Sequence, residues 1–416
     1  MKRLFEADAL TSEERLNTVI NLQVPDRAPS CPFIYYFAAR YAGITARELI
    51  GDPASYRAAM DLCFEELGPW DIYYPVNPRY PEVYSFIMPM KARWPGIDLD
   101  DDSTCQLVEG ELMRAEDYAW IIEAAREHRH LAYLVFFVEM IARAWDLPSG
   151  RKAYAHVLPR LAMHLAGWRR EFASWRKRGV TTLYGFLPEA AFDSFSLARG
   201  LTAFVKDCMR RPEEVAEAAD ALTDSYYFVT RLITALLGVR RAEVFVHRSS
   251  NDFISPAMFQ ALSFPSLKRL ADRLVAAGIS PVFHLDGDWD ENLETLRALP
   301  AGHCVVQFDG RTDIFLAKRV IGDRICIMGD VPATMLALGS VSEVDEYCHR
   351  LIEEVGCGGG FIMGAGCEIP PDAKPANVRA MLQSVLKHGY VPVTDARPAR
   401  ARLRARVNPV AFPTAP

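Results

Sequence analysis

The chain has 416 residues, of which 50% are hydrophobic and 24% are charged, and its formal net charge is −6. This composition is ordinary for a globular protein, and the slightly acidic balance argues against nucleic-acid binding, which a basic patch would favour. The sequence has neither the roughly 18 uninterrupted apolar residues of a membrane span nor an apolar signal segment at its start, and its nine cysteines are scattered, so we expect a cytoplasmic protein with reduced thiols.

The N-terminal part predicts one helix, two short strands and a long excursion. Residues 11–14 read Thr-Ser-Glu-Glu, which is typical of a helix N-cap followed by acidic residues, and the helix should end before Pro25. Strands are expected at 31–37 and 70–75, with a helical segment between them. Residues 76–110 are rich in proline, tyrosine and acidic residues, so they predict a long loop.

Helical periodicity dominates residues 115–178. Near the end of this stretch tryptophans alternate with basic residues. We interpret the face that carries them as a solvated helix edge and not as a binding site. The residues concerned are Trp168, Arg169, Arg170, Trp175 and Arg176.

From residue 180 onward, short apolar runs alternate regularly with helical stretches, as buried parallel strands do in α/β proteins. Strands are expected at 181–186, 243–248, 281–285, 303–308, 325–329 and 360–364. Helices are expected at 200–238, 256–277, 289–299, 311–321, 333–354 and 374–389. With the two earlier strands the total is eight, so the sequence predicts a (β/α)8 TIM barrel.

The predicted organisation is a single barrel domain over residues 1–395 with an N-terminal helical extension. Residues 76–178 form an insertion of loop and helix before the third strand, and we expect it to lie over the barrel mouth. Residues 396–416 form a basic tail that contains proline. This tail is expected outside the barrel, either disordered or strapped to its surface.

Three residues at predicted strand ends could hold a metal ion, because a barrel gathers its chemistry at the C-terminal ends of its strands. His284 and Asp286 are two positions apart, so their side chains point the same way from one strand. With the thiol of Cys367 they would supply nitrogen, oxygen and sulfur ligands to a catalytic zinc ion with one open position. The alternative is that His284 only forms hydrogen bonds at the mouth and that Cys367 is a buried thiol.

Other strand-end residues are candidates for catalysis or binding. His247 follows an apolar run, while Asp288 and Asp330 could act as general bases, position a substrate or cap the next helix. Asp313 is expected to be only a helix cap. Candidates for substrate or cofactor binding are Tyr184, Asp252, Asp309 and Glu368, and Glu189 is a weaker one.

Several motifs together resemble a known family. They are the ER and DRAP sequences at 14–15 and 26–29, ISPAMF at 254–259 with PSLK at 265–268, HLDG at 284–287, IMGDVP at 327–332 and GGFIMGAGCEIP at 359–370. The chain resembles the uroporphyrinogen decarboxylase superfamily, and within it the cobalamin-dependent methyltransferases that act on coenzyme M or similar thiols. The resemblance covers nearly the whole chain to about residue 390 and also implies a (β/α)8 barrel.

The resemblance implies a zinc site. In these methyltransferases a His-x-Cys pair and a distant cysteine hold zinc, and those positions match His284, Asp286 and Cys367. Asp286 departs from the pattern, because a carboxylate is a harder ligand than a thiolate. This change favours an aryl methyl ether or a folate over a thiol as substrate. The arginine-rich porphyrinogen motif of the decarboxylases is absent from residues 29–40, which disfavours porphyrin decarboxylation.

The implied function is zinc-dependent transfer of a methyl group between a small substrate (an aryl methyl ether, a thiol or a folate) and a corrinoid. The sequence lacks the Asp-x-His-x-x-Gly motif of cobalamin domains, so a partner protein would carry the corrinoid. The resemblance also allows a homodimer. One alternative is a metal-independent decarboxylase or lyase on the same scaffold. Another is a barrel that only binds a corrinoid or tetrapyrrole.

Overall fold

A five-stranded parallel sheet forms the centre of the protein. The computed structural model describes residues 1–76, 81–84 and 88–389, and the sheet has the order β5-β6-β7-β8-β9. Its strands are β5 (Arg241–Val246), β6 (Ser280–Leu285), β7 (Val305–Phe308), β8 (Cys326–Val331) and β9 (Phe361–Ala365). All of their residues except Ser280 are buried. Burial on both faces explains the unbroken apolar runs in the sequence.

Further segments connect the two edges of this sheet through backbone hydrogen bonds. β1 (Ile72–Tyr73) pairs in parallel with β4 (Thr181–Thr182), and Phe186, just beyond β4, forms a parallel bridge to β5. At the other edge Ser30 forms a parallel bridge to Met363 of β9, and its carbonyl accepts a hydrogen bond from the first residue of β1. This is a TIM-barrel-like α/β fold, in which the arc from β5 to β9 consists of regular strands.

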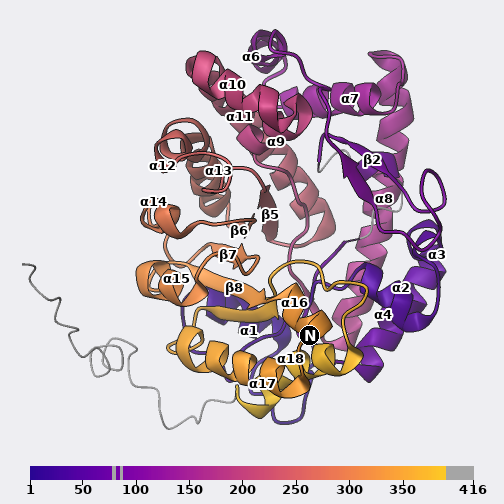
Figure 1. Cartoon of the computed structure of the whole chain (residues 1–416), viewed down its shortest axis with the longest axis vertical. Helices are drawn as coiled ribbons and strands as arrows, with labels where there is room; N and C mark the ends of the chain where they lie inside the picture. Colours follow the sequence, from indigo (N-terminus) through magenta and orange to yellow (C-terminus); the bar gives the residue numbers. More distant parts are fainter. Residues whose placement is uncertain (77–80, 85–87, 390–416) are drawn as a thin grey trace, which may run out of the picture.

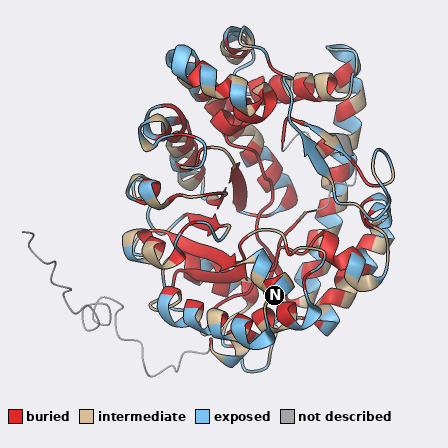
Figure 2. Cartoon of the chain, in the orientation of Figure 1, coloured by how far each residue is buried: buried red, intermediate tan, exposed pale blue. Residues whose placement is uncertain are grey.

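Helices surround the strands (Figure 1), and burial is concentrated on the strands and on the helix faces turned toward them (Figure 2). The helices of the N-terminal part are α1 (Ser12–Ile20), α2 (Tyr36–Ala42), α3 (Ala46–Gly51) and α4 (Pro53–Glu66). Those of the second half are α9 (Ala191–Arg199), α10 (Leu201–Arg210), α11 (Pro212–Leu237), α12 (Pro256–Met258), α13 (Phe264–Ala276), α14 (Leu293–Leu296), α15 (Ile314–Ile321), α16 (Ala333–Leu338), α17 (Val341–Arg350) and α18 (Pro375–Lys387).

The N-terminal helix forms as its capping residues predict. The Thr11 hydroxyl accepts a hydrogen bond from the Glu14 amide, and the Glu14 carboxylate accepts one from the Thr11 amide. The strand expected at 31–37, in contrast, is wrong in extent. Only the segment near Ser30 pairs with its neighbours, and α2 begins at Tyr36. Pro32 has no N–H to donate to a sheet, so regular pairing cannot continue through it.

The region between β1 and β4 contains more regular structure than expected. Residues 76–110, expected as a loop, include an antiparallel hairpin whose second strand is fully exposed. An exposed strand has no apolar alternation, so the sequence pattern could not reveal it. The described elements here are α5 (Pro81–Tyr84), β2 (Lys91–Arg93), β3 (Gln106–Val108), α6 (Asp117–His128), α7 (Ala132–Ala144) and α8 (Arg151–Arg178).

Helix α8 corrects the interpretation of its tryptophans. Trp168 and Trp175 are buried, whereas Arg169 and Arg170 are exposed, so only the basic residues form a solvated face. Trp175 stacks on Tyr73 of β1 with ring centroids 5.2 Å apart. The two tryptophans are seven positions apart, which places them on one helix face, and that face packs against the core.

Several expected helices are interrupted. The helix expected at 200–238 breaks at Arg211, because the next residue is Pro212 and the residue before a proline disfavours helical geometry. The segment 256–277 contains the π-helix η1 (Phe259–Ser263), and 289–299 holds only the 3-10 turn η2 (Asp290–Asn292) and α14. The segment 333–354 divides at Ser340, whose side chain caps α17, and ends in the π-helix η3 (Leu351–Val355).

Two of the sequence expectations concern segments outside the core. Among the described residues, no helix is long and apolar enough to cross a membrane. The basic tail expected at 396–416 lies outside the residues that the structure describes.

Buried ion pairs hold the N-terminal ends of the strands together. Asp71, directly before β1, accepts hydrogen bonds from Arg15 at 2.7 Å and from Arg27 at 2.6 Å. Arg27 also pairs with Asp8 at 2.8 Å, and Arg15 pairs with Asp26 at 2.7 Å. Burial alone would raise the pKa of Asp71, but the adjacent Arg27 and Arg15 outweigh burial and lower it. We call these five side chains the base network.

Candidate metal and substrate site

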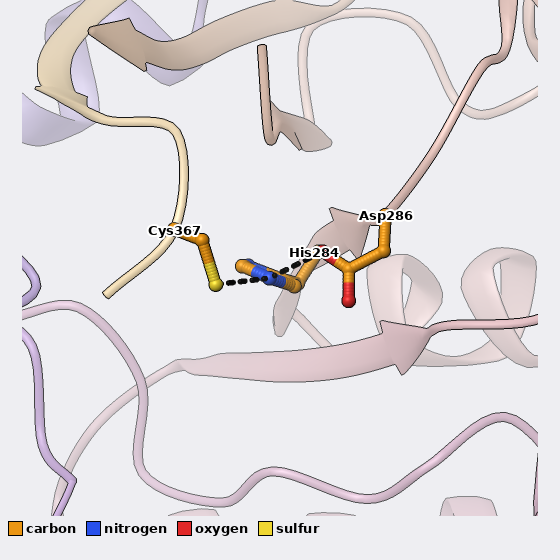
Figure 3. Close-up of side chains that lie close together, drawn as sticks. All are labelled: His284, Asp286 and Cys367. Carbon is orange, nitrogen blue, oxygen red and sulfur yellow. Dashed lines mark hydrogen bonds and ion pairs between the residues drawn. The ribbon is translucent and has the colours of Figure 1, made fainter. Parts of the chain in front are cut away.

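Three side chains converge at the C-terminal ends of β6 and β9 (Figure 3). His284 Nε2 lies 3.1 Å from Asp286 Oδ1 and 3.8 Å from Cys367 Sγ. One potential ligand atom from each residue lies within 4.8 Å of those from the other two. His284 lies in β6 and Asp286 directly follows the strand, and their side chains meet, as a spacing of two positions predicts. The loop after β9 brings the thiol of Cys367 to them from the other end of the sheet.

The second nitrogen of His284 is fixed by two polar neighbours. Gln307 Oε1 on β7 lies 3.0 Å from His284 Nδ1, and the Tyr74 hydroxyl lies 3.4 Å from it. An amide oxygen can only accept, so Nδ1 carries the proton and donates to Gln307. Nε2, which faces Asp286 and Cys367, is then the nitrogen that can bind a metal once it has given up its proton. A metal-binding histidine needs this tautomer.

His247, after β5, links the same site to a buried carboxylate. Its Nδ1 lies 2.9 and 2.8 Å from the two oxygens of Glu189, and its Nε2 lies 3.6 Å from Asp286 Oδ2. Burial lowers the pKa of His247, but the charge of Glu189 and the hydrogen bond to it outweigh burial and raise it above its ordinary value. Burial raises the pKa of Glu189 to about 7 although His247 acts in the opposite direction. The pair can hold or release a proton near neutral pH.

A further carboxylate, that of Glu243, is connected to His284 through the Tyr74 hydroxyl. Glu243 on β5 is fully buried and accepts a hydrogen bond from the Tyr74 hydroxyl, which also contacts His284. Burial raises the pKa of Glu243 to about 7, although the His284 charge and the Tyr74 bond lower it. Asp286 behaves differently. Burial raises its pKa, but the neighbouring His284 more than compensates and lowers it to about 2.

These residues open into a cavity with mostly apolar walls. The polar end is formed by the three converging residues together with His247 and Glu368. The remaining lining comes from the strand ends and from the region between β1 and β4. It comprises Phe33, Pro75, Val76, Val83, Tyr84, Met88, His164, Trp168, Leu187 and Phe245.

The structure places five of the other predicted site residues outside the cavity lining, namely Tyr184, Asp252, Asp288, Asp309 and Asp330. Asp252 Oδ2 accepts a hydrogen bond from the Asp288 amide at 3.0 Å, and Asp309 Oδ2 accepts one from the Gly287 amide at 2.8 Å. These aspartates therefore tie together the loops that follow β5, β6 and β7. The hydroxyl of Tyr184 is buried and donates to the Pro75 carbonyl at 2.6 Å.

Asp330 and Glu368 differ in where they point. Asp330 Oδ1 accepts a hydrogen bond from the Tyr347 hydroxyl of α17 at 2.7 Å, so its carboxylate faces the outer helix. Glu368 lines the cavity and accepts a hydrogen bond from the Tyr36 amide at 3.0 Å. Burial raises the pKa of Glu368 to about 7. Asp313 caps α15 through the amides of its first turn, as expected.

The residues that support His284, Asp286 and Cys367 gave weak signals in the sequence. Glu243 and Gln307 are fully buried polar residues inside otherwise apolar strands, and that exception to the apolar run was the available signal. Glu189 had only a weak signal, because it lies in no regular strand. Tyr74 could not be paired with His284 before the neighbouring strands were known.

The donor set suits zinc. Imidazole nitrogen, carboxylate oxygen and thiolate sulfur are all zinc ligands, and a catalytic site uses three protein ligands with one position left open. The tautomer fixed by Gln307 supports a metal ligand at His284 Nε2. Asp286 makes the set harder than one with two thiolates.

Sequence comparison decides the family. A family model described as uroporphyrinogen decarboxylase (URO-D) matches residues 174–388, more than half of the chain. The chain belongs to this family. Among curated proteins, it is 28% identical over 121 residues to uroporphyrinogen decarboxylase of Methylococcus capsulatus (29% of this chain, 33% of that protein). It is 23% identical over 187 residues to that of Pseudoalteromonas translucida (43% of this chain, 50% of that protein). The chain thus spans a third to a half of these relatives.

A solved structure resembles most of this URO-D family member. It is a methyltransferase from Methanosarcina mazei, with a TM-score of 0.63 and 16% sequence identity. The match covers 91% of this chain and 99% of that chain. At this identity the likeness shows a common fold, and it confirms the TIM-barrel-like architecture.

Proposed function

We propose that this protein is a zinc-dependent methyltransferase that moves a methyl group between a small substrate and a corrinoid on a partner protein. The observation that carries the proposal is the convergence of His284, Asp286 and Cys367, with one potential ligand atom from each within 4.8 Å of the others. The whole-chain likeness to a structure named as a methyltransferase supports the choice within the family.

The proposed zinc ligands are His284 Nε2, a carboxylate oxygen of Asp286 and Cys367 Sγ. When bound there, zinc would supply a Lewis acid that polarises the oxygen or sulfur atom carrying the methyl group. Gln307 holds the ligand tautomer of His284. The apolar lining of the cavity keeps water away from a reactive methyl group.

His247 is the proposed proton-transfer residue. Its Nε2 faces Asp286, and its Nδ1 is held by Glu189, so the imidazole is oriented toward the polar end of the cavity. It can protonate the heteroatom that loses the methyl group. Asp288 and Asp330 have no catalytic part in this proposal. The Asp288 carboxylate accepts a hydrogen bond from the Asp290 amide in its own loop, and the Asp330 carboxylate accepts one from Tyr347 of an outer helix.

The finer architecture is also part of the proposal. We infer a closed eight-stranded barrel over residues 1–395. Its strands would be the segment near Ser30, the paired β1 and β4, and the five regular strands β5 to β9. Residues 76–178 would be an insertion over the mouth. Val83, Tyr84 and Trp168 support this, since all three come from that region and line the cavity. The corrinoid partner would approach at the mouth, and a homodimer is compatible with this arrangement.

A second candidate is metal-independent decarboxylation or another lyase reaction. The matching curated relatives are named uroporphyrinogen decarboxylase, which favours it. Glu189 and Glu243, whose pKa values are raised to about 7, would then serve as acid and base with His247.

Metal analysis combined with a transfer assay separates the two candidates. The purified protein is expected to contain about one zinc ion per folded chain, and chelation should abolish transfer of a methyl group to a reduced corrinoid. Zinc is measured by mass spectrometry, and transfer by the visible absorbance of the corrinoid. A fully folded protein with less than roughly 0.2 zinc per chain would exclude the metal site and favour the lyase.

A further inference from the structure

A groove between α16 and α17 is larger than the cavity at the proposed metal site and has no part in the proposed function. Its volume is about 520 Å³, against about 160 Å³ for that cavity. The two helices lie next to each other beside α18 (Figure 1). Met335 and Leu338 of α16 line one wall of the groove, and Glu343, Glu346 and Arg350 of α17 line the other.

Helix α16 presents an apolar side chain to solvent from a fixed position. Leu338 is 77% exposed, and Val341 at the start of α17 is 49% exposed. The Lys374 ammonium donates hydrogen bonds to the carbonyls of Leu338 and Gly339, both at 2.9 Å. These bonds satisfy carbonyls at the end of the helix and so fix the place of Leu338. Large apolar side chains exposed around a concave surface are typical of a site that another segment covers.

The opposite wall of the groove carries negative charge. Glu343, Glu346 and Arg350 are three and four positions apart, so they share one face of α17. Arg350 pairs with Glu354 at 2.7 Å, outside the groove lining. Among the residues that the structure describes, Glu346 has no ion pair, and Glu343 accepts hydrogen bonds from Ser340, which is neutral. The groove therefore combines an apolar wall with an acidic one.

The basic tail, residues 396–416, has the complementary composition. It contains five arginines and no acidic residue, so it carries +5, and the rest of the chain carries −11 to give the total of −6. Leu403 lies between two of the arginines, and Val407, Val410 and Phe412 follow them. Opposite charges favour the approach of this segment to the acidic wall, and its apolar side chains can cover the exposed leucine.

The described part of the chain ends close to the groove. Lys387 and His388, at the end of α18, pair with Asp345 in the middle of α17 at 2.6 and 3.1 Å. Asp345 adjoins Glu346 in the sequence. Residues 390–395 can span up to about 20 Å when extended, whereas a helix with its side chains is about 10–12 Å wide. The basic tail can therefore reach the groove of its own chain.

We propose that the basic tail docks in the groove between α16 and α17 of its own chain, with apolar side chains against Leu338 and arginines against Glu343 and Glu346. A short linker keeps a tethered segment at an effective concentration of about 1 mM. Even a weak site with a dissociation constant of about 0.1 mM would then hold the tail for about nine-tenths of the time. Because α16 follows the C-terminal end of β8, the docked tail would border the end of the sheet at which His284 and Cys367 meet. Neither the metal nor the transfer reaction is needed for this docking.

Cleavage of the tail by trypsin measures the docking in the full-length protein. Trypsin cuts after arginine, and cleavage of a segment that docks and undocks rapidly follows the undocked fraction. A synthetic peptide of residues 390–416 gives the rate for an undocked tail, and the tail of the protein should be cut about ten-fold more slowly. Leu338→Ser should raise that rate at least about five-fold. Leu236→Ser, at a 52%-exposed leucine of α11 outside the groove, is the matched control and should leave it unchanged.

A zero-length crosslink identifies the docking position. Arg404→Lys keeps the positive charge and supplies an amine that a carbodiimide joins to a neighbouring carboxylate. Mass spectrometry of the monomer should find position 404 joined to Glu343 or Glu346 at least about five-fold more often than to Glu127. Glu127 is an exposed carboxylate of α6, which lies at the other end of the molecule (Figure 1).

Four results would each overturn the proposal. Two of them are cleavage of the parent tail at the rate of the free peptide, and equal rates in the parent and in Leu338→Ser that circular dichroism shows to be folded. Crosslinks that join two chains would assign the groove to the tail of a second copy. An absence of crosslinks to Glu343 and Glu346 would place the tail elsewhere. Slow cleavage that Leu338→Ser relieves, together with crosslinks to these glutamates within one chain, supports the proposal.

Discussion

At the N-terminal ends of the strands, Asp71 lies between Arg15 and Arg27, and the pKa of its carboxyl is lowered. In the middle of β5, Glu243 is just as buried but has a tyrosine as its partner, and its pKa is raised to about 7. Glu171 of α8, which accepts a hydrogen bond from Tyr73 at 2.5 Å, resembles Glu243 in this respect.

The difference shows that buried carboxylates have two roles in this fold, one in stability and one in proton exchange. Paired charges at the base hold the strand ends together, as expected for the face of a barrel that serves stability. The carboxylates with neutral partners cost stability when they ionise, but they can exchange protons near neutral pH. Substitutions at the two ends should therefore affect different properties of the protein.

Cys367→Ala is expected to have the largest effect. It should lower the rate of methyl transfer and leave the stability of the protein nearly unchanged. Loss of the proposed sulfur ligand should reduce the proposed zinc-dependent methyl transfer by about a thousand-fold or more. The free energy of unfolding of the metal-free protein should change by less than about 1 kcal/mol, because a partly exposed thiol contributes little packing. Zinc content, transfer rate and urea unfolding check these points. Cys357→Ala, outside the cavity, is the control, and parental zinc content in Cys367→Ala would remove this residue from the ligand set.

Asp71→Asn should have the opposite effect, with lower stability and unchanged zinc binding. The substitution leaves two buried arginines short of a counter-charge, so the free energy of unfolding should fall by about 3–5 kcal/mol. Urea unfolding measures the loss. Asp101→Asn, at a half-exposed ion pair with Arg47, should change it by less than about 1 kcal/mol. Zinc binding by the folded fraction should be unaffected, and a loss of zinc from folded Asp71→Asn would argue against the separation of the two ends.

Gln307→Leu tests how Gln307 supports the proposed metal site. Without the amide oxygen, His284 Nδ1 loses its fixed partner, so zinc affinity should fall about 10–100-fold. Competition with a fluorescent chelator measures this affinity. Gln307→Glu retains an acceptor at the same place and should recover most of it. If the leucine variant binds zinc like the parent, the proposed orientation of His284 is unimportant for the metal.

Glu171→Gln tests the comparison through the pH dependence of stability. Burial raises the pKa of Glu171 to about 7 in the folded protein despite opposing hydrogen bonds, from an ordinary value of 4.5. The folded state therefore holds a proton that the unfolded state has lost, and the stability from this group falls as pH rises from about 4.5 to 7. The variant has no such loss. Its advantage over the parent should grow by about 2 kcal/mol between pH 5 and pH 8, measured by urea unfolding. A pH-independent difference would contradict this assignment.

The strands of the C-terminal half could be located from the sequence because they are buried on both faces. The run before His284 and the run before Cys367 both became strands of the central sheet. Period-two geometry then predicted correctly that His284 and Asp286 lie side by side. Their meeting with Cys367 was expected from the common edge where parallel strands end, and from the family resemblance.

Some residue roles could not be predicted from the sequence, because they depend on partners from distant elements. Asp330 resembled a strand-end catalytic residue, but its carboxylate bonds to Tyr347 of an outer helix. Trp168 was assigned to a solvated edge because basic residues adjoin it in sequence, whereas the other face of α8 lines the cavity. Glu189 became significant only when the structure placed it against His247.

The loop that carries Cys367 is anchored to the opposite end of the chain. The Ile369 amide donates to the Phe33 carbonyl at 2.9 Å, and the Cys31 amide donates to the Met363 carbonyl at 2.8 Å. Contacts between residues so far apart form late in folding, after a large loop has closed. During synthesis, the thiol can join His284 and Asp286 only after the segment from Phe33 to Ile369 has left the ribosome. Loading of the proposed metal ion would therefore follow the folding of this whole segment.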